Sequence, residues 1–288
     1  MWFWYALASA IISAISVIVN KRVLHKVHAL LLSWSLFAFP IPFLTILLLK
    51  DGLPIVNRSF FTAIVAASLC FAVAKTLALS SMKNSLLSKI YPLQSVGLLF
   101  VYLLGIIFLS EVIKIINLIG LFLIIIGVYI FNIEKAKENF LEPFKLLFTN
   151  RIFLVFLVSI ILSNITAIFE KTALINSNPR SPIFVLLIEN MLMSVLLSGY
   201  LTHKDRFWLR EIKNHFWLLM LSSLIYTSLA LFVFMGFSSG PVVLVIGIKK
   251  LEVLFVLLFS WVFFHDKLTR HTWIASLIML AGVVLIKI

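Results

Sequence analysis

The chain has 288 residues, of which 62% are hydrophobic and only 12% are charged, and its mean hydropathy is +1.15. These values exclude a soluble globular domain and predict an all-α integral membrane protein. The net charge of +13 would suggest nucleic acid in a soluble protein. Here the basic residues fall between apolar segments, where they orient spans and contact phospholipids, so we expect membrane lipids and no nucleic acid as partners.

Polar breaks divide the sequence into ten apolar segments that are long enough to cross a bilayer. Backbone groups inside lipid must bond internally, so every span should be helical. The first segment lacks the basic start of a cleavable signal peptide, and we keep it as a span. The expected spans are 2–20, 30–49, 59–79, 85–109, 114–132, 152–173, 182–201, 215–236, 241–264 and 270–287.

The longest break, residues 133–151, acts as a linker between two sets of five spans, residues 1–132 and 152–288. Three segments of the first half match segments of the second half in the same order. Because each half has an odd number of spans, the second half enters the membrane in the opposite orientation. We therefore predict two inverted five-helix repeats. The matches are ISVIVNKRVL with ITAIFEKTAL, LALSSMKNSLLSKIYPLQ with FMGFSSGPVVLVIGIKKLE, and FLSEVIKIINLIGLFLIIIGV with FFHDKLTRHTWIASLIMLAGV.

Two adjacent lysines, Lys249 and Lys250, lie near the middle of the span expected at 241–264. A charge at the bilayer centre costs about 2.5–3.5 kcal/mol on translocon scales, so these lysines should face protein or a water-filled cavity. Glu252 shares a helix face with Lys249, and one interpretation is an internal ion pair that only stabilises packing. We favour the other interpretation, in which at least one ammonium group binds an anionic group of a solute.

The segment of the first half that aligns with these lysines contains Lys89, Tyr91 and Gln94. Tyr91 and Gln94 offer uncharged hydrogen-bonding groups to the same cavity, whereas Lys89 either adds a charge or extends to the interface. The predicted substrate-binding residues are therefore Lys249, Lys250, Glu252, Tyr91, Gln94 and Lys89.

Further polar residues are expected inside the membrane at Lys75, Asn164 and Glu189. Glu170 lies at the end of a span, where anchoring at the membrane interface is the favoured interpretation. A carboxyl group in an apolar setting can load and release a proton, which makes Glu189 a candidate for proton coupling. The alternative is a structural partnership between Glu189 and Lys171 or another buried lysine.

Other residues suggest architectural roles. Glu111 and Asp266 each precede a span and are expected to cap the helix that follows. Small residues in spans five and ten permit close helix approach, namely Gly120, Gly127, Ala275 and Gly282.

The sequence contains no recognisable catalytic constellation. Its six histidines lie in or beside breaks without metal-ligand spacing, and there is no Walker sequence for ATP. Its one cysteine, Cys70, excludes an intramolecular disulfide. We expect no catalytic residues, no metal and no cofactor, and therefore not an enzyme.

Several of these motifs resemble the EamA-like members of the drug/metabolite transporter superfamily. They are IIFLSEV with Glu111, VFFHDKL with Asp266 in place of the more usual Glu, the IIGVYIF and LAGVVLI helix ends, and NKRVL and EKTAL. The resemblance covers nearly the whole chain. It implies ten helices around a cavity formed mainly by spans one, three, four, six, eight and nine. It also implies alternating access and both termini in the cytoplasm. Members of the superfamily carry amino acids, sugars, nucleotide sugars, organic phosphates and drugs.

The charges in the breaks favour a different orientation. Of the 24 lysines and arginines, fourteen fall on the side of the 133–151 break, six fall on the side of the termini, and four lie within spans. The positive-inside rule then places both termini outside, whereas the resemblance implies the reverse.

We predict a multi-pass secondary transporter of the plasma membrane that moves a small polar, anion-bearing metabolite, such as an amino acid or a sugar phosphate, with a proton or another ion as the coupling partner. One alternative is a flippase for a lipid-linked sugar, which needs a lateral opening. Others are a membrane enzyme acting on a phosphorylated lipid, and a scaffold with a dry, packed interior.

Overall fold

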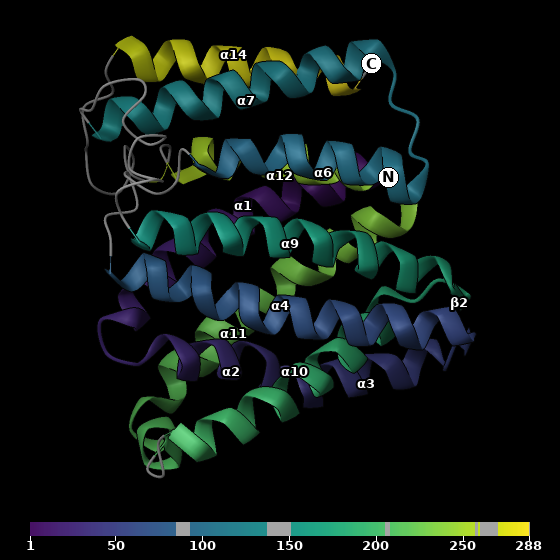
Figure 1. The fold of residues 1–288 in the computed structure, drawn as a ribbon, viewed down its shortest axis with the longest axis vertical. Coiled ribbons are helices and arrows are strands. Elements are labelled where there is room, and N and C mark those ends of the chain that lie inside the picture. The colour runs from purple at the N-terminus through teal and green to yellow at the C-terminus, as the bar shows by residue number, and fades with distance from the viewer. Residues whose placement is uncertain (85–92, 137–150, 205–207, 257–258, 260–269, 288) are drawn as a thin grey trace.

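A computed structural model describes residues 1–84, 93–136, 151–204, 208–256, 259 and 270–287 (Figure 1). The helices are α1 (Trp2–Leu24), α2 (Ala29–Ala38), α3 (Ile41–Asp51), α4 (Arg58–Asn84), α6 (Leu93–Leu109), α7 (Ile115–Ala136), α9 (Arg151–Ile175), α10 (Pro182–Lys204), α11 (Trp208–Ser239), α12 (Val242–Lys249) and α14 (Arg270–Lys287). In the described part of the chain, six helical segments are long and apolar enough to cross a membrane, and three shorter apolar helices accompany them. The predicted helical membrane protein is confirmed.

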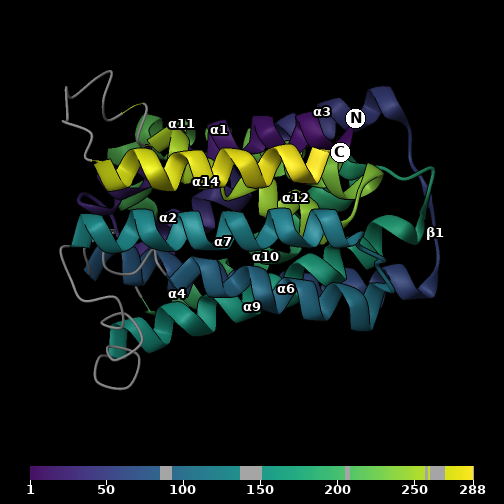
Figure 2. The same ribbon diagram turned by 90° about the horizontal axis from the view of Figure 1, so that it is seen from above.

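The long helices lie side by side, with α4 packed against α9 and α1 packed against α11. Helices α7 and α14 pack together along one edge of the bundle (Figures 1 and 2). Both chain termini lie at one end of the bundle, which also carries β2 (Figure 1). We call this the terminal end.

Two expected spans are interrupted. The span expected at 30–49 consists of α2 and α3, which are separated at Phe39 and Pro40 because Pro40 has no N–H to continue the helical ladder. The span expected at 241–264 is not one continuous helix, because α12 ends at Lys249 and a turn follows at Lys250 and Leu251.

Two short strands were not predicted. β1 (Ile55–Val56) and β2 (Ser177–Asn178) pair antiparallel and join the connection before α4 to the connection after α9. The Asn57 side-chain amide donates a hydrogen bond of 2.7 Å to Asn176 Oδ1 beside them. Two-residue strands have no sequence periodicity to reveal them, and only the approach of the two connections creates the pair.

Small residues bring α7 and α14 close together, as predicted. A methyl group added at Gly120 would lie 2.6 Å from the carbonyl oxygen of Gly282, and one added at Gly127 would lie 2.9 Å from that of Ala275. Asn117 strengthens the same contact by donating from Nδ2 to the carbonyl oxygen of Ile286 at 2.9 Å. The two backbones therefore touch, and their approach depends on glycine.

The helix directions show which end of the bundle carries most of the described basic residues, and this predicts the orientation of the protein in the membrane. Basic residues gather at the end opposite the terminal end, where α1, α4 and α10 finish and α9 and α11 begin: Lys21, Arg22, Lys26, Lys83, Arg151, Lys204, Arg210 and Lys213. We expect this basic end to face the cytoplasm.

Cysteine labelling tests the orientation. In a Cys70→Ser background, Leu53→Cys at the terminal end should react with an impermeant maleimide in intact cells, because Leu53 is exposed. His203→Cys, exposed at the basic end, should react only after permeabilisation. The reverse labelling pattern would place both termini in the cytoplasm, as the family resemblance implies.

Candidate functional site

A cavity of about 250 Å³ lies at the centre of the bundle. Its described lining comes from α1, α4, α6, α9, α11 and the α12 region, and also from α2 through Phe37 and from α10 through Glu189. The described lining therefore includes all six spans that were expected to form most of the cavity, and spans two and seven contribute as well. The cavity counts against the dry interior that a scaffold would have.

The cavity is lined by equal numbers of acidic and basic side chains among its described residues. They are the lysines Lys75, Lys249 and Lys250 and the glutamates Glu170, Glu189 and Glu252. All six come from segments that are apolar on average. Because an unpaired charge is expensive in this environment, their partners distinguish a structural role from a binding role.

The helix is interrupted by a turn where the two predicted lysines lie. Lys249 is the last residue of α12. Beyond it, two backbone hydrogen bonds span three residues, as in a 3₁₀ turn: the N–H of Leu251 donates to the carbonyl oxygen of Ile248 at 3.0 Å, and the N–H of Leu254 donates to that of Leu251 at 2.9 Å. Such tight turns inside a helical span are frequent at functional hinges, and discontinuous helices often form transporter sites. The lysines thus lie at an interruption and not on a regular helix face.

Lys250 and Glu252 are held by other helices. The Lys250 ammonium donates to Gln94 Oε1 of α6 at 2.6 Å, and Glu252 accepts a hydrogen bond from the Ser13 hydroxyl of α1. Three of the predicted substrate-binding residues, Lys250, Gln94 and Glu252, therefore line the cavity while already bonded to protein. Their hydrogen bonds connect the segment after α12 to α6 and α1, and so hold the cavity wall in place.

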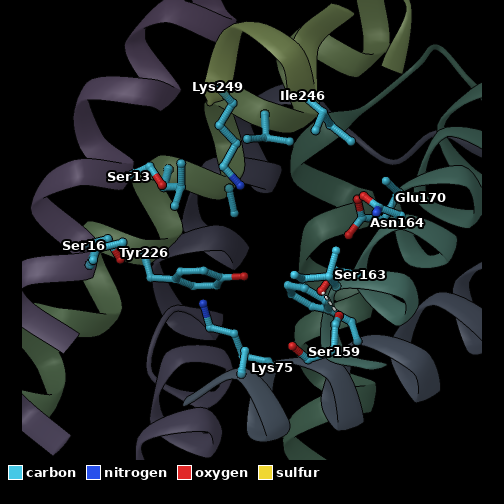
Figure 3. A pocket seen from close by; sticks show the side chains of 18 of the residues that line it. Ser13, Ser16, Lys75, Ser159, Ser163, Asn164, Glu170, Tyr226, Ile246 and Lys249 are labelled. Carbon is cyan, nitrogen blue, oxygen red and sulfur yellow. Dashed lines mark hydrogen bonds between the residues drawn. The ribbon is translucent and has the colours of Figure 1, made fainter. Parts of the chain in front are cut away.

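Lys249 differs from its neighbour. Its side chain is half-buried and points into the cavity (Figure 3). Within the described part of the chain, its ammonium group has no hydrogen bond or ion pair, and Glu252 is not its partner. A cation of this kind is available to bind a solute.

Lys75 of α4 was expected to be buried but was not among the predicted binding residues. Its ammonium lies 3.9 Å from the centroid of the Tyr226 ring, so a cation–π contact holds it at the cavity wall (Figure 3). The signal in the sequence was a lone lysine in the apolar run of α4. Tyr226 gave no signal, because a single tyrosine in α11 is equally consistent with packing.

Two carboxylates come from consecutive helices. Glu170 of α9 and Glu189 of α10 are only 7% and 1% exposed, and both line the cavity. Oε1 of Glu189 has no hydrogen-bond partner among the described residues. Lys171 is not that partner, since its ammonium donates to the carbonyl oxygens of Phe237 and, at 3.0 Å, Gly240.

Two predicted binding residues, Lys89 and Tyr91, lie outside the described residues, as does Asp266. The prediction that Glu111 caps the following helix is wrong. Its carboxylate accepts from the N–H groups of Val242, at 2.7 Å, and Val243, at 3.4 Å, and so caps α12 of the other half. The positive N-terminus of α12 provides the same attraction as the local helix, and tertiary packing decides between them.

Electrostatic contacts reinforce this cap at the terminal end. Burial raises the pKa of Glu111, and the hydrogen bonds from Val242 and Val243 and the charge of Lys171 oppose that shift. Arg180 donates to the carbonyl oxygen of Ser238 at 3.1 Å, and Lys171 donates to that of Gly240 at 3.0 Å. Both side chains thus supply donors to carbonyl groups at the end of α11. The α11–α12 turn is therefore bound by charged groups from both halves.

Comparisons with known proteins agree with this architecture. A solved structure described as "Crystal structure of protein" is similar in fold, with a TM-score of 0.69 and 11% sequence identity over 99% of this chain and 94% of that chain. The search of curated proteins found no match. The model of the EamA-like transporter family matches residues 1–133 and 150–288. This chain therefore belongs to the EamA-like transporter family, within the drug/metabolite transporter superfamily.

Proposed function

We propose that this protein is a secondary transporter that moves a small, polar, anion-bearing metabolite across the plasma membrane by alternating access. The observation that carries the proposal is the Lys249 ammonium, which points into a central cavity at the interruption after α12 without a bonded partner among the described residues. A solute anion would supply that partner. Lys250, fixed by Gln94, would add positive potential to the same region.

Alternating access requires two units that rock against each other, for which we propose inverted repeats at residues 1–132 and 152–288. Equivalent lysine contacts support this division. Lys21 of α1 donates to the carbonyl oxygen of Met82 near the end of α4, and Lys171 of α9 donates to that of Phe237 near the end of α11. α1 begins at the terminal end whereas α9 finishes there, so the two contacts would stabilise opposite ends of the cavity (Figure 1).

Proteoliposome counterflow tests the function. Vesicles loaded with amino acids, sugar phosphates or nucleotide sugars should exchange at least one anion-bearing solute, and Lys249→Gln should reduce that exchange by about tenfold or more, because a hydrogen bond to a charged group is lost. Glu211→Gln, outside the cavity lining at the start of α11, is the control and should exchange normally.

Two results would contradict the proposal. One is exchange of cations alone, and the other is anion exchange that is unchanged in Lys249→Gln.

A further inference from the structure

We propose that Glu170 and Glu189 form a cation subsite for the primary ammonium group of a zwitterionic solute whose carboxylate binds Lys249. This proposal rests on the proposed transport function and specifies its substrate class. It makes α9 and α10 a second recognition wall, in addition to the lysines.

The first argument is the separation of charge within the cavity. Figure 3 shows the Lys249 side chain projecting into the cavity from above and Glu170 projecting from the right-hand wall, with the Tyr226 ring and Lys75 below Lys249 on the left. The cavity lies between the two, and neither Lys249 nor Glu170 bonds to another described residue across it. A zwitterion that spans the gap can therefore present its carboxylate to Lys249 and its ammonium group to Glu170.

The second argument is the unsatisfied oxygen of Glu189. This side chain is almost fully buried, yet Oε1 has no hydrogen-bond donor among the described residues. A buried acceptor without a donor is destabilising by about 1–3 kcal/mol, so native structures rarely leave one without a purpose. An ammonium group brings three donors and could satisfy Glu189 and Glu170 together.

One amide beside the carboxylates is oriented by another helix. Asn164 of α9 donates from Nδ2 to the carbonyl oxygen of Gly97 at 2.9 Å, which leaves its Oδ1 as a neutral acceptor. The acceptors on this wall that can carry a negative charge are the carboxyl groups of Glu170 and Glu189.

The third argument is that groups of both signs are available. Three lysines and three glutamates line the described cavity, so a zwitterion can pair its carboxylate with a lysine and its ammonium group with a glutamate. A sugar phosphate would bring two negative charges towards the carboxylates, and a simple amine would bring its positive charge towards the lysines. Either solute would meet one repulsive wall, which discriminates against it.

Apolar surface surrounds the charged groups and suggests where the rest of the solute lies. Phe37, Phe71 and Phe156 line the cavity together with aliphatic side chains. A zwitterion with a small apolar substituent, such as a free amino acid, can bury that substituent against these rings. Leucine and phenylalanine are therefore suitable probes.

The experiment compares matched probes that differ by one charged group. Purified full-length protein is titrated with L-leucine, with 4-methylpentanoate, which lacks the ammonium, and with 3-methylbutylamine, which lacks the carboxylate. Phenylalanine, 3-phenylpropanoate and 2-phenylethylamine form the second set. We expect each amino acid to bind about tenfold or more tightly than either analogue, because one charge-assisted hydrogen-bonded group is lost each time.

Variants assign the two ends of the probe. In Glu170→Gln and Glu189→Gln, the preference for the amino acid over its deaminated analogue should fall to about threefold or less, since only the carboxylate wall then discriminates. In Lys249→Gln, the preference for the amino acid over its amine should fall instead. Glu211→Gln is the matched control and should retain both preferences. The two glutamate substitutions are near-isosteric, and gel-filtration profiles show whether each variant remains folded.

Three results would overturn the cation subsite: equal affinity of the wild type for the amino acids and their deaminated analogues, no binding of either amino acid, or retained discrimination in both glutamate variants. If sodium ions or acidification restore tight binding of the deaminated analogues, the carboxylates take a free cation from solution, and the zwitterion assignment is wrong. None of these results affects the proposed function, which fails only if Lys249-dependent anion exchange is absent.

Discussion

Replacing Lys249 by methionine should raise the thermal midpoint of the solute-free protein while reducing solute exchange at least about tenfold. The Lys249 ammonium is half-buried in the cavity and has no hydrogen bond or ion pair to another described residue. Removing a half-buried charge that no described hydrogen bond or ion pair holds, and keeping an apolar side chain of similar length, should stabilise the fold by about 1–2 kcal/mol. Transport should fall by at least about tenfold, because the anion loses its charged donor.

The neighbouring lysine provides the control for this prediction. Lys250→Met removes the 2.6 Å hydrogen bond to Gln94 and leaves the half-buried Oε1 of Gln94 without this donor, so it should destabilise the protein by about 1–2 kcal/mol. Adjacent lysines should thus give stability changes of opposite sign in thermal unfolding. If Lys249→Met lowers the thermal midpoint as much as Lys250→Met, Lys249 has a structural partner and our assignment of a binding role is wrong.

A single methyl group at Gly282 should destabilise the protein more than most substitutions in the bundle. A Cβ there would lie 2.5 Å from the carbonyl oxygen of Gly120 and 3.0 Å from Ile124 Cγ1. The closest neighbour is backbone of the facing helix, which cannot move aside as a side chain can. We therefore expect Gly282→Ala to separate α7 from α14 and to lower the free energy of unfolding by about 2–4 kcal/mol.

Gly199 is a suitable comparison, because it lies in α10 and nothing lies within 4 Å of a Cβ added to it. Gly199→Ala should be neutral or should stabilise the protein by about 1 kcal/mol through helix propensity. Thermal unfolding in detergent measures both variants. Equal stability of Gly282→Ala and the wild type would mean that α7 and α14 are not held by this backbone contact. Neither residue lines the cavity, so the effect on stability should be separable from solute binding.

The sequence alone determined the properties that depend on composition and period. Apolar length predicted the helices, because a membrane span has a minimum length, and the expense of midplane charge identified Lys249 and Lys250 as residues that avoid lipid. Small residues in spans five and ten predicted the α7–α14 contact, because only glycine permits that separation. The shared motifs predicted the family, which the family match shows.

Only the tertiary structure decided which polar groups meet. The sequence placed Lys249 and Lys250 in equivalent positions, yet Gln94 of α6 holds one and leaves the other facing the cavity. It assigned Glu111 to the next helix, whereas packing presents it to α12 of the other half. Lys75, Tyr226 and Glu170 join the site through α4, α11 and α9, which are distant in the chain. Hydropathy and helical period act over neighbouring residues, whereas hydrogen bonds between helices depend on rotation and depth, which are set when the helices pack.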